Sequence, residues 1–218
     1  MTQSVDALAL RAAVPRPATT TRFSLAGVLL FLLAAQFMIV IMLGASMAPG
    51  YDLSGGAISD LGVIDETAWL FNASLLAVGA LSLLAGIVLH GATGRRSILA
   101  VFAFAGLGAA GAGLVPLDVS DLHGLFALVA FLLFNVEPFV IGWLVPGPMR
   151  WVSWVSGLVG IGFVVLMVIG DSGSPAVFGA IGHGGAERMI VYPVMLWLLA
   201  FGGYLMAGGR VRTVEDKE

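Results

Sequence analysis

Three side chains that could exchange protons with a substrate lie where apolar stretches of the sequence end: Asp60, His123 and Glu187. Carboxyl and imidazole groups are the usual general acids and bases of enzymes. Arg188 directly follows Glu187, and its planar fork of N–H donors suits a phosphate or a carboxylate group. We therefore expect a polar pocket in which Asp60, His123 and Glu187 supply acid and base, while Arg188 holds an anionic head group.

Glu137 is the only acidic or basic residue inside any of the long apolar stretches. A carboxylate at that depth in a membrane costs about 2.5–3.5 kcal/mol, so it is a functional candidate. It follows His123 by 14 residues, which places it about 21 Å deeper and about 40° around an ideal helix. His123 and Glu137 can thus face one interior groove, whereas Asn135, about 160° from Glu137, points elsewhere.

Each of these residues also has a purely structural interpretation. Acidic residues solvate loops, and Glu187 at the start of a sixth helix would be favoured by the helix dipole. Ser120 is a candidate N-cap for a fourth helix. Glu137 could be a neutral group that holds helices together through hydrogen bonds. The sequence leaves the structural and the functional interpretation of these residues open.

The sequence predicts neither a metal site nor a cofactor. It contains no cysteine and no histidine pair at the spacing of a zinc-binding helix. The acidic and histidine candidates come from separate loops. The net charge of −3 and the lack of a basic run argue against nucleic acid as a partner.

The composition is typical of a membrane protein. Charged residues make up 11% of the 218 residues, against roughly 25% in an ordinary soluble domain. Apolar residues make up 59%, and the mean hydropathy is +1.03. A soluble domain of this size could not hide so much apolar surface. The sequence therefore predicts that the lipid bilayer is the protein's immediate surroundings.

Six stretches are long enough to cross about 30 Å of hydrocarbon as helices. They cover residues 24–48, 67–90, 97–116, 122–145, 151–170 and 189–208. The sequence thus predicts an all-α integral membrane protein, a six-transmembrane-helix bundle over 24–208 between polar tails 1–23 and 209–218. Segment 171–185 is rich in glycine and serine, which is typical of a surface loop. Glycines that recur in the second, third and fifth stretches indicate close helix packing.

The basic residues indicate the orientation of these spans. With six spans, nine of the ten lie on one side, which the positive-inside rule assigns to the cytoplasm. They are Arg11, Arg16, Arg22, Arg95, Arg96, Arg150, Arg210, Arg212 and Lys217. Both termini are then cytoplasmic, and the expected location is the cell membrane. Arg188 is the exception on the outer side.

Four short strings carry a resemblance to a known family. They are AISDLG at 57–62, LFN at 70–72, HGLF at 123–126 and GAER at 185–188, with Tyr192-Pro193 following. In this order and at span ends, they resemble the domain-of-unknown-function 998 family of small prokaryotic multi-pass membrane proteins, over roughly residues 24–208. The resemblance implies a six-helix bundle and supplies no activity. The positions it singles out are Ser59, Asp60, Asn72, His123, Glu187 and Arg188, and Glu137 matches none of its motifs.

Three classes of function remain open. The preferred one is an outer-side pocket that binds a lipid or an isoprenoid and acts on it by acid–base chemistry. The second is a small proton-coupled transporter that uses Glu137, and the third is a structural or accessory membrane protein without catalysis. The candidate catalytic residues are Asp60, His123 and Glu187, and the candidate ligand-binding residues are Ser59, Asn72, Arg188, Tyr192 and Glu137.

Overall fold

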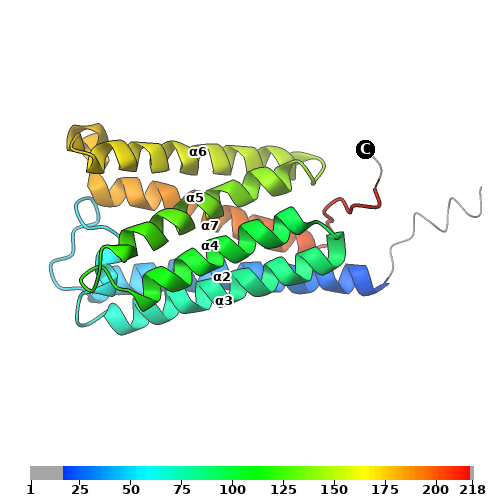
Figure 1. The fold of residues 1–218 in the computed structure, drawn as a ribbon, viewed down its shortest axis with the longest axis horizontal. Helices are drawn as coiled ribbons and strands as arrows, with labels where there is room; N and C mark the ends of the chain where they lie inside the picture. The colour runs from blue at the N-terminus through cyan, green and yellow to red at the C-terminus, as the bar shows by residue number, and fades with distance from the viewer. Residues whose placement is uncertain (1–16, 217–218) are drawn as a thin grey trace, which may run out of the picture.

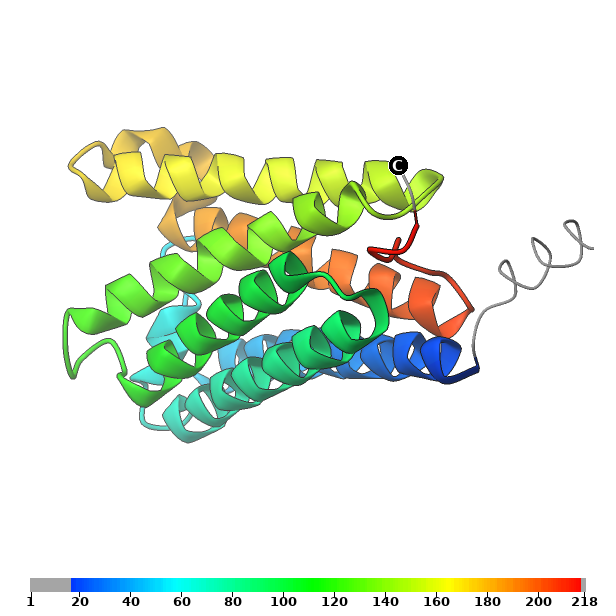
Figure 2. The same ribbon diagram turned by 45° about the vertical axis from the view of Figure 1, so that its right-hand side comes forward.

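The computed structural model describes residues 17–216 as long helices that run side by side and are joined by short connections (Figures 1 and 2). The long helices are α2 (Pro17–Met47), α3 (Ala68–Thr93), α4 (Arg96–Leu114), α5 (Leu122–Gly142), α6 (Pro148–Asp171) and α7 (Gly182–Met206). Two 3-10 helices, η1 (Ser59–Gly62) and η2 (Pro175–Ile181), lie in the connections. No strand occurs within this part of the chain. The predicted six-helix fold is confirmed, since six helices are long and apolar enough to cross a membrane.

The six helices form a closed ring. Each helix packs against its neighbour in sequence, and α7 returns to pack against α2. Neighbouring helices run antiparallel (Figure 1), and the longest connection, 48–67 between α2 and α3, contains η1. The apolar core lies inside the ring and includes Leu30, Phe102, Ile141, Trp197 and Phe201, all 1% exposed or less.

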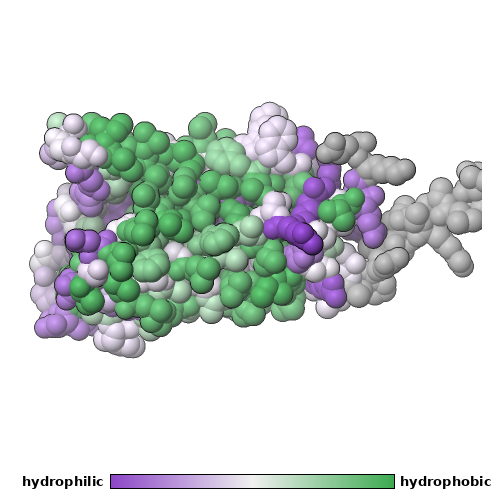
Figure 3. Space-filling view, viewed as in Figure 1, coloured by the Kyte–Doolittle hydropathy of each residue, from purple (hydrophilic) through white to green (hydrophobic). Residues whose placement is uncertain are grey.

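The surface is divided into an apolar middle and polar ends, as a bilayer requires. On the face shown in Figure 3, apolar side chains cover the middle of the bundle and polar side chains gather at its two ends. We call the end that carries connections 48–67, 115–121 and 172–181 the loop end, and the opposite end the terminal end. Both ends of the described chain lie at the terminal end (Figure 1), as an even number of spans requires. The assignment of that end to the cytoplasm stays a prediction.

Glycines allow the tightest helix crossings. A side chain on Gly79 of α3 would approach the backbone oxygen of Gly106 of α4 to 2.6 Å, and Gly27 of α2 would meet Gly202 O of α7 at the same distance. Because a Cβ does not fit at such distances, these pairs hold the backbones close together. The glycines of the second and third stretches therefore have the packing role that the sequence predicted.

Two helices begin earlier than the sequence predicted. α2 starts at Pro17, a residue favoured at the first position of a helix, so residues 17–23 extend the first span rather than the tail. α7 starts at Gly182, and η2 precedes it, so the predicted surface loop 171–185 is largely helical. The first turn of α7 is stabilised from outside, because the N–H of Gly184 donates to the carbonyl of Ser54 at 2.8 Å. Residues 1–16 of the predicted N-terminal tail lie outside the described residues.

The C-terminal segment is packed, although its polar sequence predicted a simple tail. Val211 is 1% exposed. The N–H of Arg212 donates to Leu144 O, and the N–H of Val214 donates to Thr93 O, both at 2.9 Å. Arg95 donates to the carbonyls of Arg212 and Thr213. The segment thus closes the terminal end of the bundle between the ends of α3 and α5.

Candidate functional site

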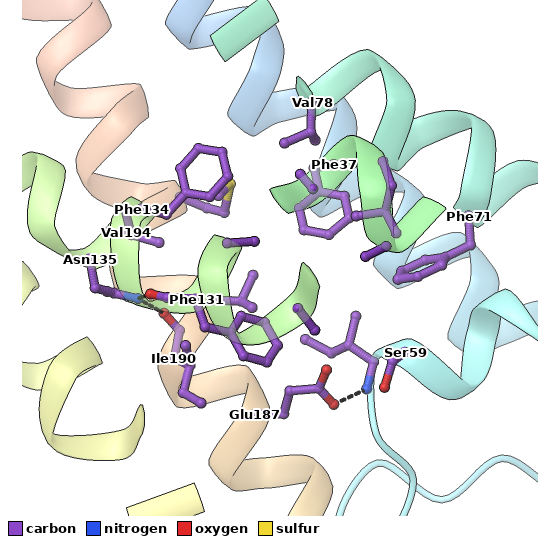
Figure 4. A pocket seen from close by; sticks show the side chains of 18 of the residues that line it. Phe37, Ser59, Phe71, Val78, Phe131, Phe134, Asn135, Glu187, Ile190 and Val194 are labelled. Atoms are coloured by element: carbon purple, nitrogen blue, oxygen red, sulfur yellow. Dashed lines mark hydrogen bonds between the residues drawn. The ribbon is translucent and has the colours of Figure 1, made fainter. Parts of the chain in front are cut away.

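A cavity of about 60 Å³ lies inside the ring of helices. By this measure one water molecule needs about 10–15 Å³, so the cavity holds several waters or part of an apolar chain. Residues from α2, α3, α4, α5, α7 and η1 line it, and most are phenylalanine, alanine, valine, isoleucine or leucine (Figure 4). The polar residues on its wall are Ser59, His123, Asn135 and Glu187. Three of these four come from the loop end.

Glu187 lies in the second turn of α7 and is 4% exposed. Its carboxylate accepts a hydrogen bond from the N–H of Ile58 at 2.6 Å, as the dashed line in Figure 4 shows. Ile58 and Ser59 also line the cavity. The prediction that Glu187 stands at the helix start is wrong, because α7 begins at Gly182 and buries the carboxylate against loop 51–62.

His123 is the second residue of α5 and is 4% exposed. Its Nδ1 lies 2.8 Å from Val115 O. A carbonyl oxygen only accepts hydrogen bonds, so Nδ1 carries the hydrogen. Nε2 is then the basic nitrogen of the neutral ring, and it has no hydrogen-bond partner among residues 17–216. The Ser59 hydroxyl likewise has none in this part of the chain.

Arg188 is 8% exposed and holds the loop rather than the cavity wall. Its Nη1 donates to the carbonyls of Leu53 and Gly56, both at 2.9 Å, and of Gly184 at 2.8 Å. Its Nη2 donates to the Tyr51 hydroxyl at 2.7 Å. The guanidinium therefore fixes the first connection onto α7.

Tyr51 completes this anchor. Its hydroxyl donates to Ala57 O at 2.5 Å, with Gly56 O at 3.1 Å. Burial raises the pKa of the Tyr51 phenol above its ordinary value, against the lowering effect of Arg188. The phenol thus stays protonated at neutral pH, so it can donate to the loop while it accepts from Arg188.

Asp60, Asn72 and Tyr192 do not line the cavity. The carboxylate of Asp60 accepts from the N–H of Ala57 at 2.9 Å, and the amide of Asn72 donates to Gly62 O at 2.9 Å. Both side chains therefore hold the backbone of the same connection that Glu187 and Arg188 hold. Tyr192 is half-buried and packs against the apolar core. Their expected roles toward a ligand stay predictions.

Glu137 is fully buried in α5, and neither of its carboxyl oxygens has a hydrogen-bond partner within residues 17–216. It does not line the cavity, which instead reaches Asn135 on the same helix. The amide of Asn135 donates to Phe131 O at 2.8 Å and to Ile190 O at 3.1 Å (Figure 4). The expectation that His123 and Glu137 face one groove is therefore wrong for this cavity, because its wall on α5 includes His123 and Asn135 but not Glu137. Asn135 and Glu137 point in different directions, as their spacing on the helix predicted.

No metal centre forms among the described residues, since no three His, Cys, Asp or Glu side chains come together there. The second histidine at the loop end, His183, lies 3.2 Å from Asp171 on the surface. Both side chains are exposed, at 40% and 55%. This pair is separate from the cavity wall.

Several residues that shape the site could not be identified from the sequence. Ile58 offers a backbone N–H, and Tyr51 offers a hydroxyl, and both act only because α7 lies against their loop. The apolar wall, including Phe37, Phe134 and Val194, cannot be told from ordinary core by residue type. The adjacent acidic and basic residues Glu187 and Arg188 were the one clue in the sequence that α7 contacts another segment here.

Together, the ring of six membrane-spanning helices and the internal cavity define a multi-pass membrane protein with an apolar chamber that has polar groups at one end. A family profile covers residues 26–204, and the chain belongs to that family, described as "Protein of unknown function (DUF998)". No curated protein and no solved structure matches the chain. The function must therefore be inferred from the site itself.

Proposed function

We propose that the protein binds a lipid or an isoprenoid in the cavity, with its apolar chain among the helices and its polar end at the loop end. The observation that carries the proposal is the division of the cavity wall. Ser59, His123 and Glu187 line the cavity at its loop end, from η1 and the first two turns of α5 and α7, and apolar side chains make up most of the remaining wall. Such a wall matches a molecule with one polar end and one apolar end.

The same arrangement supports acid–base chemistry on the bound molecule. The Nε2 of His123 is a candidate base that receives no hydrogen bond from the described residues. The carboxyl group of Glu187 is a second proton carrier on the cavity wall. Asp60 lies on the neighbouring loop, where its carboxylate holds the Ala57 N–H. We assign the acid–base step to His123 and Glu187, with Asp60 as a positioning residue.

Native mass spectrometry of the protein purified from membranes tests the binding proposal. Wild-type protein should retain a lipid-sized adduct. Ala127 lines the cavity, so Ala127→Phe should fill it and remove the adduct. Ala80 is exposed on the outer face of α3, so Ala80→Phe adds the same ring outside the cavity and should keep the adduct. Equal adducts in both variants would refute the proposal.

A second candidate function is proton-coupled transport through Glu137. A fully buried carboxyl group without a partner is the observation that favours it. A transport path needs polar groups from His123 past Glu137 to the terminal end, and on α5 the cavity lining stops at Asn135. Proton uptake by vesicles that contain the protein should fall in Glu137→Gln if this function holds. Unchanged uptake would remove it.

A further inference from the structure

At its loop end, the cavity wall offers more hydrogen-bond acceptors than donors. In the neutral imidazole of His123, Nε2 is an acceptor, because the hydrogen bond to Val115 O places the ring hydrogen on Nδ1. The carboxylate of Glu187 also accepts, and it has lone pairs left beside the one that the Ile58 N–H occupies. The Ser59 hydroxyl can donate and accept, and it is unpartnered in the described chain. A ligand that satisfies these groups must itself donate a hydrogen.

The charges of the wall exclude an anionic head group. No lysine or arginine is among the described residues that line the cavity. Arg188 follows Glu187 in sequence, but three backbone carbonyls and the Tyr51 hydroxyl occupy its terminal nitrogens. A phosphate or carboxylate would be buried beside Glu187 without a cation, which is strongly unfavourable. The Nε of Arg188 has no partner in the described chain, but Arg188 does not line the cavity, so its guanidinium does not meet the head group there.

A cationic head group fits less well than a neutral one. An ammonium would lose its hydration on entering a wall that is mostly apolar, and a single carboxylate compensates that loss only in part. A hydroxyl has a far smaller desolvation cost. It can donate to His123 or Glu187 while it accepts from Ser59, so each polar group of the wall can find a partner.

We infer that the head group held at Ser59, His123 and Glu187 is an uncharged hydroxyl, so that the ligand is a lipid or isoprenoid alcohol. This inference rests on the proposed binding of a chain in the cavity, and it names the class of that ligand. The unpartnered Ser59 hydroxyl and His123 Nε2 become its hydrogen-bond partners.

Five probes with the same chain test the head group: decane, decanol, decylamine, decanoic acid and decyl phosphate. Each is titrated into the full-length protein in lipid nanodiscs, and the rise in the thermal unfolding midpoint gives the affinity. Decanol should bind about tenfold tighter than decane, as one or two hydrogen bonds would give. It should also bind more tightly than the three charged probes.

Two variants connect this preference to the named side chains. Ser59→Ala removes a hydroxyl that bonds nothing in the described chain, so folding should be unaffected while decanol loses its advantage over decane. His123→Leu should also remove the advantage, and it should lower stability as well because it breaks the hydrogen bond to Val115 O. His183→Leu, at a histidine outside the cavity wall, should retain the advantage. Decane should bind equally to all of them.

The outcomes separate the two proposals. Tightest binding of decanoic acid, decyl phosphate or decylamine would overturn the hydroxyl assignment and leave cavity binding in place, as would an unchanged decanol preference in Ser59→Ala. Binding of no probe, or equal binding of all probes by wild type and Ala127→Phe, would overturn the binding proposal itself.

Discussion

Arg188 and Glu137 are both buried charged residues of this bundle, and their surroundings are opposite. Arg188, near the loop end of α7, donates hydrogen bonds to three carbonyls and a phenol. Glu137, in the middle of α5, has no partner within residues 17–216. Arg188 is 8% exposed and Glu137 is not exposed at all. Burial alone therefore does not distinguish them, whereas the number of partners does.

The difference separates a structural role from a functional candidate. A buried charge with several partners fixes the conformation around it, and here Arg188 fixes the connection that carries Ile58 and Ser59 to the cavity. A buried carboxyl group without partners lowers stability and fixes nothing. Glu137 is therefore a candidate for a role other than folding, and for this reason we test it in proton transport.

The largest expected effect is that of Arg188→Met. The variant removes every hydrogen bond of the guanidinium and leaves the carbonyls of Leu53, Gly56 and Gly184 without this donor. We expect a loss of at least about 3 kcal/mol of stability, because several buried acceptors lose their donor at about 1–3 kcal/mol each. The thermal unfolding midpoint in detergent measures it.

Arg95→Met is the matched control for that variant. Arg95 also donates to two backbone carbonyls, but at the exposed terminal end. Hydrogen bonds that water can replace contribute little, so we expect a loss below about 1 kcal/mol. Equal losses of stability in the two arginine variants would show that the hydrogen bonds of buried Arg188 contribute no more than those of Arg95.

The second effect is that of Gly184→Ala, which tests how closely loop and helix approach. The added Cβ would lie 2.0 Å from Gly56 O, so the loop must move away from α7. We expect a loss of about 1–3 kcal/mol, the usual cost of overpacking, and weaker ligand binding in the cavity. Gly124→Ala on α5, where a Cβ meets nothing within 4 Å, should be neutral or stabilising. Similar midpoints for both would contradict the docked loop.

The third effect has the opposite sign. Glu137→Leu removes two buried oxygens that lack partners, so we expect stability to rise by about 1–3 kcal/mol. Asn135→Leu, two residues earlier, breaks hydrogen bonds to Phe131 O and Ile190 O and should lower stability. A destabilised Glu137→Leu would show that the carboxyl group has a partner in the folded protein and would weaken its functional candidacy.

The sequence predicted most of the fold because membrane helices are fixed by long-range composition. Hydropathy and charge set six spans, since each must satisfy its own backbone in lipid. The prediction from the sequence failed where tertiary contacts override the local secondary-structure preference. Glycine and serine in segment 171–185 favoured a loop, yet the docked connection 51–57 stabilises helix from Gly182.

The site was partly predictable. Its polar wall includes His123, Glu187 and Ser59, which stood out by residue type. The sequence did not show that Glu187 and Arg188 have different roles, because two adjacent charged residues suggest a single site. In the folded chain the first lines the cavity and the second holds the loop. Only three-dimensional placement distinguishes a side chain that is engaged from one that is free.

The smallest expected effect concerns Asp52, the exposed acidic residue of the same loop. The backbone N–H groups of Ser54 and Gly55 donate to its carboxylate, at 3.2 and 2.7 Å, and these bonds lower its pKa in the folded protein. A lowered pKa means that the carboxylate stabilises the loop above its unfolded pKa of about 4, and that this stability is lost as the pH falls through the folded value. The unfolding midpoint should therefore fall more on acidification in wild type than in Asp52→Asn. Asp118→Asn, at an exposed aspartate of the next loop, should keep the wild-type pH dependence. If both variants keep it, the bonds at Asp52 do not contribute to the docking that Arg188 dominates.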